Sequence, residues 1–376
     1  MALFALPPET ASRKPHLFDN KPFMAFWEVT RACDLVCKHC RACAVPERNP
    51  FELSTDEGTA LLDSLADMGV PLVVITGGDP AKREDLVDLV RHGASTGMRM
   101  ALTPSATRLV TLDLLRDLRD AGLARLAVSL DGAKAETHDG FRGMPGSFSR
   151  TFEILHQAKS IGLTTQINTS VTRGSLQELD AIADLIRQFE VELWGVFFVV
   201  PTGRATSDDV VDGGDVEEVL LRLANLRNSV PFDIKTTAAP HFRRVLMTPR
   251  NTNKESSTRQ AESHCTIKGI ADGVGRAPRG VNDGSGILFI AHNGDVYPSG
   301  FLPVQCGNVR RDSIADIYRN HPLFRSLRDG DALQGKCGAC EFRYVCGGSR
   351  ARAYSMLGHP LASDPACSYV PRGWIA

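Results

Sequence analysis

Four cysteines lie close together near the start of the chain, in TRACDLVCKHCRAC, residues 30–43. Their spacing is Cys33-x3-Cys37-x2-Cys40, followed by Cys43. Thiolates are soft ligands that suit iron–sulfur clusters, and three of them on one loop can hold three irons of a [4Fe–4S] cube. The fourth iron would keep an open position for a reactant, so this spacing favours a reactive cluster on Cys33, Cys37 and Cys40.

Two simpler interpretations of this loop stay open. Cys43 could close the cube and make an ordinary electron-transfer cluster, or the loop could bind zinc. The order of the cysteines differs from the ferredoxin-type run C-x2-C-x2-C-x3-C-P.

A second group of cysteines lies near the end of the chain, with the spacing Cys337-x2-Cys340-x5-Cys346 and a distant Cys367. Four thiolates from a short loop and a returning tail can complete a cluster or a zinc site. Ten cysteines in a reducing compartment indicate metal sites rather than disulfides. Cys265 and Cys306 stand alone, and lone thiols are more often buried packing residues.

Composition limits the partners. The chain has 376 residues, 43 Lys and Arg against 44 Asp and Glu, and 43% hydrophobic residues. This balance gives no electrostatic attraction to nucleic acid or to an anionic membrane surface. The start of the chain has no signal-peptide pattern, and no stretch is apolar enough to span a membrane. We therefore expect a cytoplasmic globular protein that acts on a small molecule or a peptide.

The elements that must position these cysteines alternate along the chain. Six short stretches rich in β-branched and aromatic residues are typical of buried strands: 23–29, 72–76, 98–104, 125–131, 165–171 and 194–200. Helical segments lie between them, and the first begins with a capping box of Ser54 and Glu57 and ends at Gly69. Other helices are expected to end at Gly97, Gly122 and Gly162. This order predicts an α/β fold, a partial (β/α)6 TIM-like barrel with chemistry at the carboxyl ends of its strands.

The first cysteine loop resembles the signature of the radical S-adenosylmethionine (SAM) enzymes, which also has an aromatic residue, here His39, before the last cysteine. That family has a GGEP motif after the second strand, where this chain has GGDP at 77–80. Glycines 77 and 78 allow close approach of backbone to a ligand, and carbonyls with Asp79 can accept from the amino group of SAM. Without the family context, GGDP is more often a plain turn.

Further positions resemble the SAM contacts of the family. The stretches are SLDG at 129–132, HDGFRG at 138–143 and QINTSVT at 166–172. The resemblance implies that Ser129 and Arg142 hold the methionine carboxylate, which a planar guanidinium matches, and that Asn168 faces the ribose or adenine. The alternatives are a turn for SLDG, a surface ion pair for Arg142 and an ordinary polar strand residue for Asn168.

The C-terminal part resembles the SPASM extension of radical SAM enzymes, a small cysteine-rich iron–sulfur domain with up to two auxiliary clusters. A hairpin with Asn293 and Gly294 at its turn stands at its start. The fuller pattern has cysteines where this chain has Ser299 and Ser349. The resemblance therefore implies one auxiliary [4Fe–4S] cluster, on Cys337, Cys340, Cys346 and Cys367. The expected divisions are an N-terminal extension at 1–22, the core at 23–247, a linker or lid at 248–286 and the auxiliary domain at 287–376.

The resemblance also implies the activity. The cluster would reductively cleave SAM to a 5′-deoxyadenosyl radical, with a reducing partner such as flavodoxin or ferredoxin. Within the SPASM group the chain looks most like the enzymes of haem d1 and alternative haem synthesis, which favours a tetrapyrrole-like substrate. A maturase of ribosomally made peptides is the alternative; about twenty residues precede the first strand, too few for a fused leader-binding domain. A nonenzymatic electron carrier would leave GGDP and the open loop unexplained.

Overall fold

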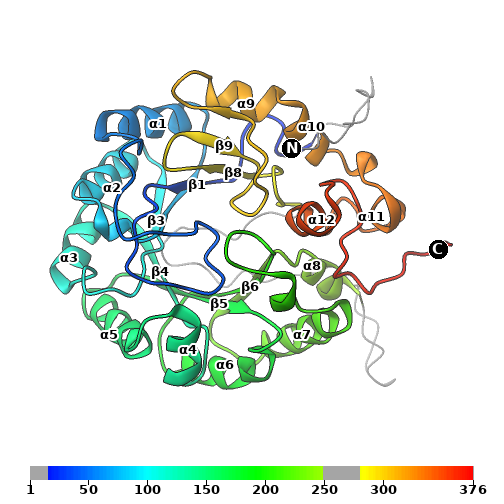
Figure 1. The fold of residues 1–376 in the computed structure, drawn as a ribbon, viewed down its shortest axis with the longest axis horizontal. Coiled ribbons are helices and arrows are strands. Elements are labelled where there is room, and N and C mark those ends of the chain that lie inside the picture. Colours follow the sequence, from blue (N-terminus) through cyan, green and yellow to red (C-terminus); the bar gives the residue numbers. More distant parts are fainter. Residues whose placement is uncertain (1–15, 249–279, 376) are drawn as a thin grey trace, which may run out of the picture.

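The chain folds around one twisted sheet that curls inside a ring of helices (Figure 1). The structure is a computed structural model that describes residues 16–248 and 280–375. The strands of these residues are β1 (Met24–Glu28), β2 (Leu72–Thr76), β3 (Arg99–Leu102), β4 (Leu123–Ser129), β5 (Thr165–Val171), β6 (Leu193–Phe198), β7 (Asp233–Thr237), β8 (Ile287–Ile290), β9 (Asp295–Tyr297) and β10 (Gly307–Asn308). Their order in the sheet is β10-β9-β8-β1-β2-β3-β4-β5-β6-β7.

The six predicted strands are all present as β1 to β6, and they pair in parallel in chain order. The predicted α/β partial barrel is therefore confirmed. The structure adds a parallel strand at each end, because β7 pairs with β6 and β8 pairs with β1. The sequence signal of β7 is weak, since only Ile234 of its five residues is buried.

Helices follow most of the strands and cover the outside of the sheet (Figure 1). They are α1 (Thr55–Asp67), α2 (Leu86–Ser95), α3 (Leu112–Asp120), α4 (Ala135–Arg142), α5 (Ser147–Ser160), α6 (Leu179–Ile186), α7 (Gly213–Leu226) and α8 (His241–Met247). The capping box of Ser54 and Glu57 starts α1 as predicted, and Gly69 follows its end with φ of 76°. The main core lies between the sheet and these helices, where Trp27 is fully buried.

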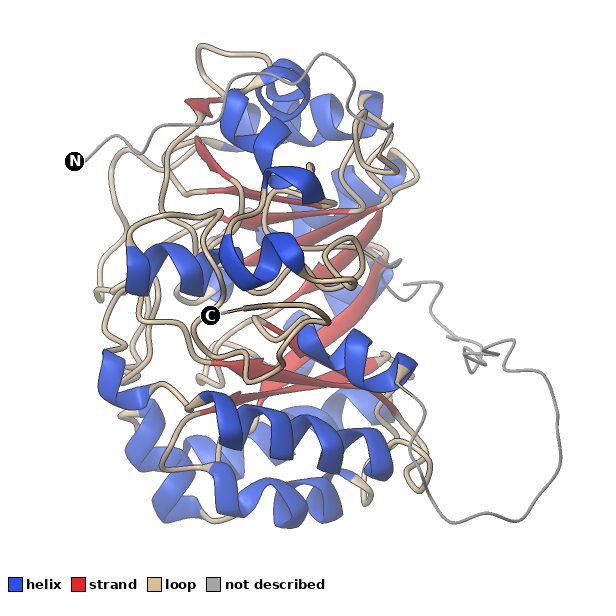
Figure 2. Cartoon of the chain, turned by 90° about the vertical axis from the view of Figure 1, so that its right-hand side faces the viewer, coloured by secondary structure: helices blue, strands red, loops and turns tan. Residues whose placement is uncertain are grey.

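The C-terminal part continues the same sheet before it turns helical. Strand β9 pairs antiparallel with β8 and β10, and Gly294 makes the predicted tight turn with φ of 86°. The chain then forms α9 (Ile314–Asn320), α10 (Pro322–Leu327), α11 (Gly335–Ala339) and α12 (Arg350–Leu357). Helices α11 and α12, at the right of Figure 1, face the viewer in the side view (Figure 2).

The parallel pairing of β8 with β1 joins residues 287–290 to the barrel sheet. The predicted division at residue 287 remains a prediction. Most of the expected linker at 248–286 and the lone Cys265 lie outside the described residues, as does most of the expected N-terminal extension. No helix in the described ranges is long and apolar enough to cross a membrane.

Candidate metal centres

The first cysteine loop follows β1 and lies at the carboxyl ends of the parallel strands, where the fold predicts chemistry. Cys33 and Cys37 are buried and Cys40 is half-buried, in a small apolar cluster with Leu35 and Ala44. Besides burial, the nearby Cys37 raises the pKa of the Cys33 thiol, and the nearby Cys40 raises the pKa of the Cys37 thiol. The structure therefore brings the three predicted ligands together on one loop.

Hydrogen-bond donors surround these sulfurs. The amide of Leu35 donates to Cys33 Sγ and that of Ala44 to Cys40 Sγ, each at 3.4 Å. Arg142 Nη1 donates to Cys37 Sγ at 3.7 Å. Burial raises the pKa of the Cys33 and Cys37 thiols, so bare thiolates are disfavoured there. Bound metal replaces those protons, and the donors suit the anionic sulfurs of an iron–sulfur cluster.

A site for a single metal ion, such as zinc, needs several ligand side chains that converge on one point. In the described part of the chain, no group of three or more His, Cys, Asp or Glu side chains is arranged to hold one metal ion. The fit to a cluster therefore rests on the donor set and on the contacts to the sulfurs. Cys43 adopts a left-handed backbone with φ of 47°, and its amide donates to the Cys40 carbonyl at 3.2 Å. Its role as a fourth ligand stays untested.

Glycines hold the cysteine loop against the neighbouring strands. A side-chain carbon on Gly77 would lie 2.5 Å from the Thr30 carbonyl oxygen, and one on Gly78 would lie 2.4 Å from the Ala32 carbonyl oxygen. Both distances are far below van der Waals contact. The close approach for which GGDP needs glycine is therefore to the backbone that leads into the loop.

The segment that follows β6 also contacts the cysteine loop, and the sequence did not predict this contact. Gly203 packs on the Cys40 carbonyl, and a side-chain carbon there would lie 2.3 Å from that oxygen. Arg204 donates from its amide to the Cys40 carbonyl at 3.1 Å and from its guanidinium to the Cys37 carbonyl at 3.3 Å. No local sequence signal predicts this contact, because it crosses the barrel.

Asp79 is fully buried, and its carboxylate accepts hydrogen bonds from other groups of the protein. It accepts from the Thr107 hydroxyl at 2.6 Å and from the amides of Ala81 and Ser105 at 3.2 and 3.3 Å. Burial raises its pKa. The side chain thus fixes the turn after β2, and its predicted contact with the amino group of SAM remains a prediction.

Arg142 lies between a carboxylate and a predicted cluster ligand. Its Nε is 2.6 Å from Asp131 Oδ2, within the SLDG stretch, and its Nη1 faces Cys37. Although burial opposes the charged form, Asp131 holds the pKa of Arg142 above its usual value. This ion pair is buried rather than on the surface. The predicted carboxylate-binding role of Arg142 remains a prediction.

Ser129 and Asn168 are opposite each other across the β4–β5 pairing, near the same edge. Both side chains are half-buried, and Asn168 Oδ1 accepts from Gln166 at 2.7 Å. His39 stacks on Phe141 with ring centroids 4.3 Å apart, and its Nδ1 is buried without a hydrogen-bond partner among the described residues. The orphaned Nδ1 of His39, on the cysteine loop itself, suits a polar ligand such as SAM.

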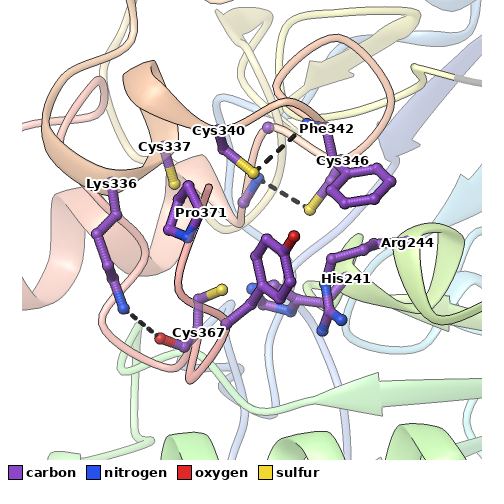
Figure 3. Close-up of a pocket in the computed structure, with 12 residues that line it drawn as sticks. His241, Arg244, Lys336, Cys337, Cys340, Phe342, Cys346, Cys367 and Pro371 are labelled. Atoms are coloured by element: carbon purple, nitrogen blue, oxygen red, sulfur yellow. Dashed lines mark hydrogen bonds between the residues drawn. The ribbon is translucent and has the colours of Figure 1, made fainter. Parts of the chain in front are cut away.

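The second cysteine group surrounds a pocket between α8 and the C-terminal helices (Figure 3). All four predicted ligands, Cys337, Cys340, Cys346 and Cys367, line it. Amides donate to three of the sulfurs at 3.4 Å each: Phe342 to Cys340, Gly348 to Cys346 and Asp364 to Cys337. Lys336 donates to the Cys367 carbonyl at 2.6 Å and ties the tail to α11. These residues fit an iron–sulfur cluster.

His241, at the start of α8, was missed by the sequence analysis. It is buried beside Cys367, and its Nε2 lies 3.2 Å from Asp364 Oδ2. Although burial opposes protonation, the Asp364 carboxylate raises the pKa of His241 to about 9. Burial likewise opposes ionisation of Cys367, but the contact with His241 holds the pKa of that thiol below its usual value.

The two serines that replace the cysteines of the fuller pattern have local structural roles. Ser349 is fully buried and caps α12, accepting from the Arg352 amide at 3.2 Å. Ser299 accepts from the Phe301 amide at 3.3 Å. Cys306 is buried with its thiol toward the Val304 carbonyl, and burial raises its pKa to about 12. These contacts describe a packing cysteine, a helix-capping serine at 349 and a turn-forming serine at 299.

The comparisons with known proteins agree with this architecture. Residues 27–186 match the family described as the radical SAM superfamily, and residues 282–341 match the iron–sulfur cluster-binding domain SPASM. The chain belongs to the radical SAM superfamily and carries a SPASM domain. It is an enzyme with an iron–sulfur cluster and SAM as cofactors.

Several enzymes are similar to this chain over most of its length. The chain is 40% identical to an AdoMet-dependent heme synthase of Nitratidesulfovibrio vulgaris, over 92% of each chain. It is 30% identical to an Fe-coproporphyrin III synthase of Methanosarcina barkeri, over 93% of this chain and 88% of that one. It is 29% identical to a PqqA peptide cyclase of Rhodopseudomonas palustris, with the same coverage. The solved structure of Streptococcus suis SuiB bound to its precursor peptide SuiA has the same fold, with a TM-score of 0.70 and 16% identity over 93% of this chain and 76% of that one.

Proposed function

We propose that this enzyme remodels side chains of a tetrapyrrole in the synthesis of haem. The observation that carries the proposal is 40% identity to a haem synthase along nearly the whole of both chains. A second relative is named for making Fe-coproporphyrin III. Fe-coproporphyrin III has four propionates where haem has two propionates and two vinyl groups, so it is the substrate to test first.

The ligand sets follow from the two cysteine groups. Cys33, Cys37 and Cys40 hold the cluster that binds SAM, and Cys337, Cys340, Cys346 and Cys367 hold one auxiliary [4Fe–4S] cluster. The contacts to sulfur from Leu35 and Ala44 at the first site, and from the amides around the second, support these sets. When bound and reduced, the first cluster with SAM supplies a 5′-deoxyadenosyl radical that abstracts hydrogen from the substrate.

The chain's own residues orient and enclose these groups. Glycines 77, 78 and 203 fix the loop of Cys33, Cys37 and Cys40 between the ends of β2 and β6. Arg142, with Asp131, fixes a positive charge beside Cys37, where it can serve the cluster and the methionine carboxylate together. Ser129 and Asn168 offer polar atoms at the β4–β5 edge for the rest of SAM. The proposal also places the enzyme in the cytoplasm, with a flavodoxin or ferredoxin as the protein that reduces its SAM-binding cluster.

The test is an anaerobic assay of reconstituted enzyme with SAM, dithionite and Fe-coproporphyrin III. Conversion of one propionate into a vinyl group releases carbon dioxide, passes one hydrogen atom to the 5′-deoxyadenosyl radical and leaves one electron, which the auxiliary cluster in its oxidised state would accept. We expect 5′-deoxyadenosine to form in step with a product that has lost these groups, as measured by liquid chromatography and mass spectrometry. Cleavage of SAM without any change of the porphyrin would contradict the tetrapyrrole proposal while leaving the enzyme class intact.

Peptide maturation is the second candidate. The relative named as a PqqA peptide cyclase favours it, at 29% identity. The fold shared with peptide-bound SuiB does not decide between the two, since at 16% identity it shows the architecture alone. A precursor-peptide gene beside the gene of this enzyme would favour maturation, and genes of haem synthesis would favour the tetrapyrrole.

A further inference from the structure

Arg350 and Arg352 follow the two glycines of CGGSRAR and are both buried, but they differ in whether a carboxylate neutralises their charge. Arg352 is 1% exposed and lies 3.1 Å from both carboxylate oxygens of Asp364. Arg350 is 2% exposed, and in residues 16–248 and 280–375 no carboxylate lies within ion-pair distance of it. An isolated buried charge is expensive unless a group of opposite sign compensates it.

Among the described residues, the hydrogen-bond partners of the Arg350 guanidinium are three uncharged carbonyls and one sulfur. Its Nη1 donates to the carbonyls of Pro360 and Ala362 at 3.0 and 2.7 Å, and its Nε donates to that of Gly348 at 3.2 Å. Its Nη2 lies 3.5 Å from Cys337 Sγ. The side chain is therefore held by carbonyls with one edge turned toward a proposed cluster ligand.

Gly348 makes this approach possible. It has φ of 66°, and a side-chain carbon there would lie 2.5 Å from Arg350 Nη2 and 3.0 Å from Cys337 Sγ. Any larger residue would come between the guanidinium and the sulfur. The second glycine of GGSR thus serves the contact between Arg350 and Cys337 as well as the turn.

We propose that Arg350 is a charge partner of the auxiliary cluster, in addition to His241 beside Cys367, and that its charge raises the reduction potential of the cluster. The inference rests on the proposed ligand set, because a [4Fe–4S]²⁺ cube on four thiolates carries two negative charges. Reduction adds a third, and a fixed positive charge beside Cys337 stabilises the reduced state. Arg350 touches no reacting atom, so it is a positioning and tuning residue.

The experiment uses full-length protein in which Cys33, Cys37 and Cys40 are all replaced by Ala, so that only the auxiliary cluster is measured. In this background, Arg350→Gln removes the charge and Arg350→Lys keeps it while losing the planar contacts. The midpoint potential is followed by electron paramagnetic resonance during reductive titration, and iron and sulfide are counted in each sample. If the protein with the three alanines contains no iron, the proposed ligand set of the auxiliary cluster is refuted. If it contains the cluster but the reduction potential does not change when Arg350 is replaced, only the role of Arg350 is refuted.

We expect Arg350→Gln to lower the ratio of reduced to oxidised cluster at a fixed potential at least tenfold, which is 59 mV for a one-electron couple. Arg350→Lys should recover most of this loss. A purely structural role would give the same potential in all three proteins, or an equal loss of iron from both variants, and either result overturns the proposal. Loss of iron from Arg350→Gln but not from Arg350→Lys supports it, because the charge alone then retains the cluster.

Arg83→Gln is the matched control. Arg83 is also buried and also donates to carbonyls, those of Val29 and Leu53, but it is paired with Asp85 and lies next to β1. This variant should destabilise the fold without shifting the potential of the auxiliary cluster. An equal shift in Arg83→Gln would show that the potential follows general destabilisation and would overturn the role of Arg350.

Discussion

The hydroxyl oxygen of Ser105 lies 3.3 Å from the sulfur of Cys33, and it donates to the Gly78 carbonyl at 2.9 Å. Ser105 follows β3, so one small side chain links the cysteine loop after β1 to the turn after β2. Cys33 loses its thiol proton when it binds iron, and the single hydroxyl proton of Ser105 would then have to turn from the Gly78 carbonyl to the sulfur in order to donate to it. This contact joins three separate stretches of sequence at one predicted ligand.

Ser105→Ala should lower the reduction potential of the SAM-binding cluster, because hydrogen bonds to cluster sulfurs stabilise the reduced state. Iron content should stay close to that of the wild type. Electron paramagnetic resonance during reductive titration measures the potential. Ser105→Thr keeps the hydroxyl and is the control; equal potentials in the Ala and Thr variants would show that the contact with Cys33 has no electronic effect.

Replacing Cys33, Cys37 or Cys40 singly by Ala should abolish SAM cleavage, since each removes one of three ligands. Cys43→Ala should leave cleavage largely intact. The measurement is 5′-deoxyadenosine formed with dithionite under anaerobic conditions, together with iron content. If Cys43→Ala loses the cluster, Cys43 is a ligand and the cube is closed.

Ser349→Ala should lower the free energy of unfolding by about 1 kcal/mol, the usual effect of losing a helix N-cap. It should leave iron unchanged at about eight atoms per chain, the content of two [4Fe–4S] clusters. Denaturant unfolding and iron analysis together test this. A wild-type count of about twelve would indicate a third cluster and make Ser349, Cys265 or Cys306 a candidate ligand. A fall from about eight to about four in the variant would show instead that one of the two clusters depends on Ser349.

His138 should make the protein less stable in mild acid. It is 1% exposed, it accepts from the Asp131 amide at 3.0 Å, and burial lowers its pKa to about 4. Because its folded pKa lies below the unfolded value of 6.5, its contribution is present above pH 6.5 and is lost as the pH falls toward 4. From pH 7.5 to 5.5 the loss is about 1 kcal/mol.

His138→Asn keeps an acceptor for the Asp131 amide but does not titrate. The free energy of unfolding of the wild type should therefore fall by about 1 kcal/mol more than that of the variant when the pH is lowered from 7.5 to 5.5. Parallel pH profiles for the two proteins would mean that His138 does not carry the acid sensitivity. Each profile is measured by denaturant unfolding of the reconstituted protein.

Local sequence determined much of this protein. Buried strands β1 to β6, the capping box at Ser54 and the turn at Gly294 depend on residues that are neighbours in the chain, so hydrophobic patterning and turn chemistry predict them. The two cysteine groups are also local, apart from Cys367. Their spacing was enough to propose the ligands and, with GGDP, to indicate the enzyme class.

Tertiary structure decided what fills the space around those ligands. Strand β8 joins β1 across more than two hundred residues of sequence, and Arg204 and Ser105 reach the first cysteine loop from elements that no local pattern connects to it. Asp79, which the motif alone suggests as a SAM ligand, has its carboxylate taken by Thr107 and two amides. The physical reason is that burial and hydrogen-bond satisfaction are set by distant neighbours, which the folded chain alone brings into contact.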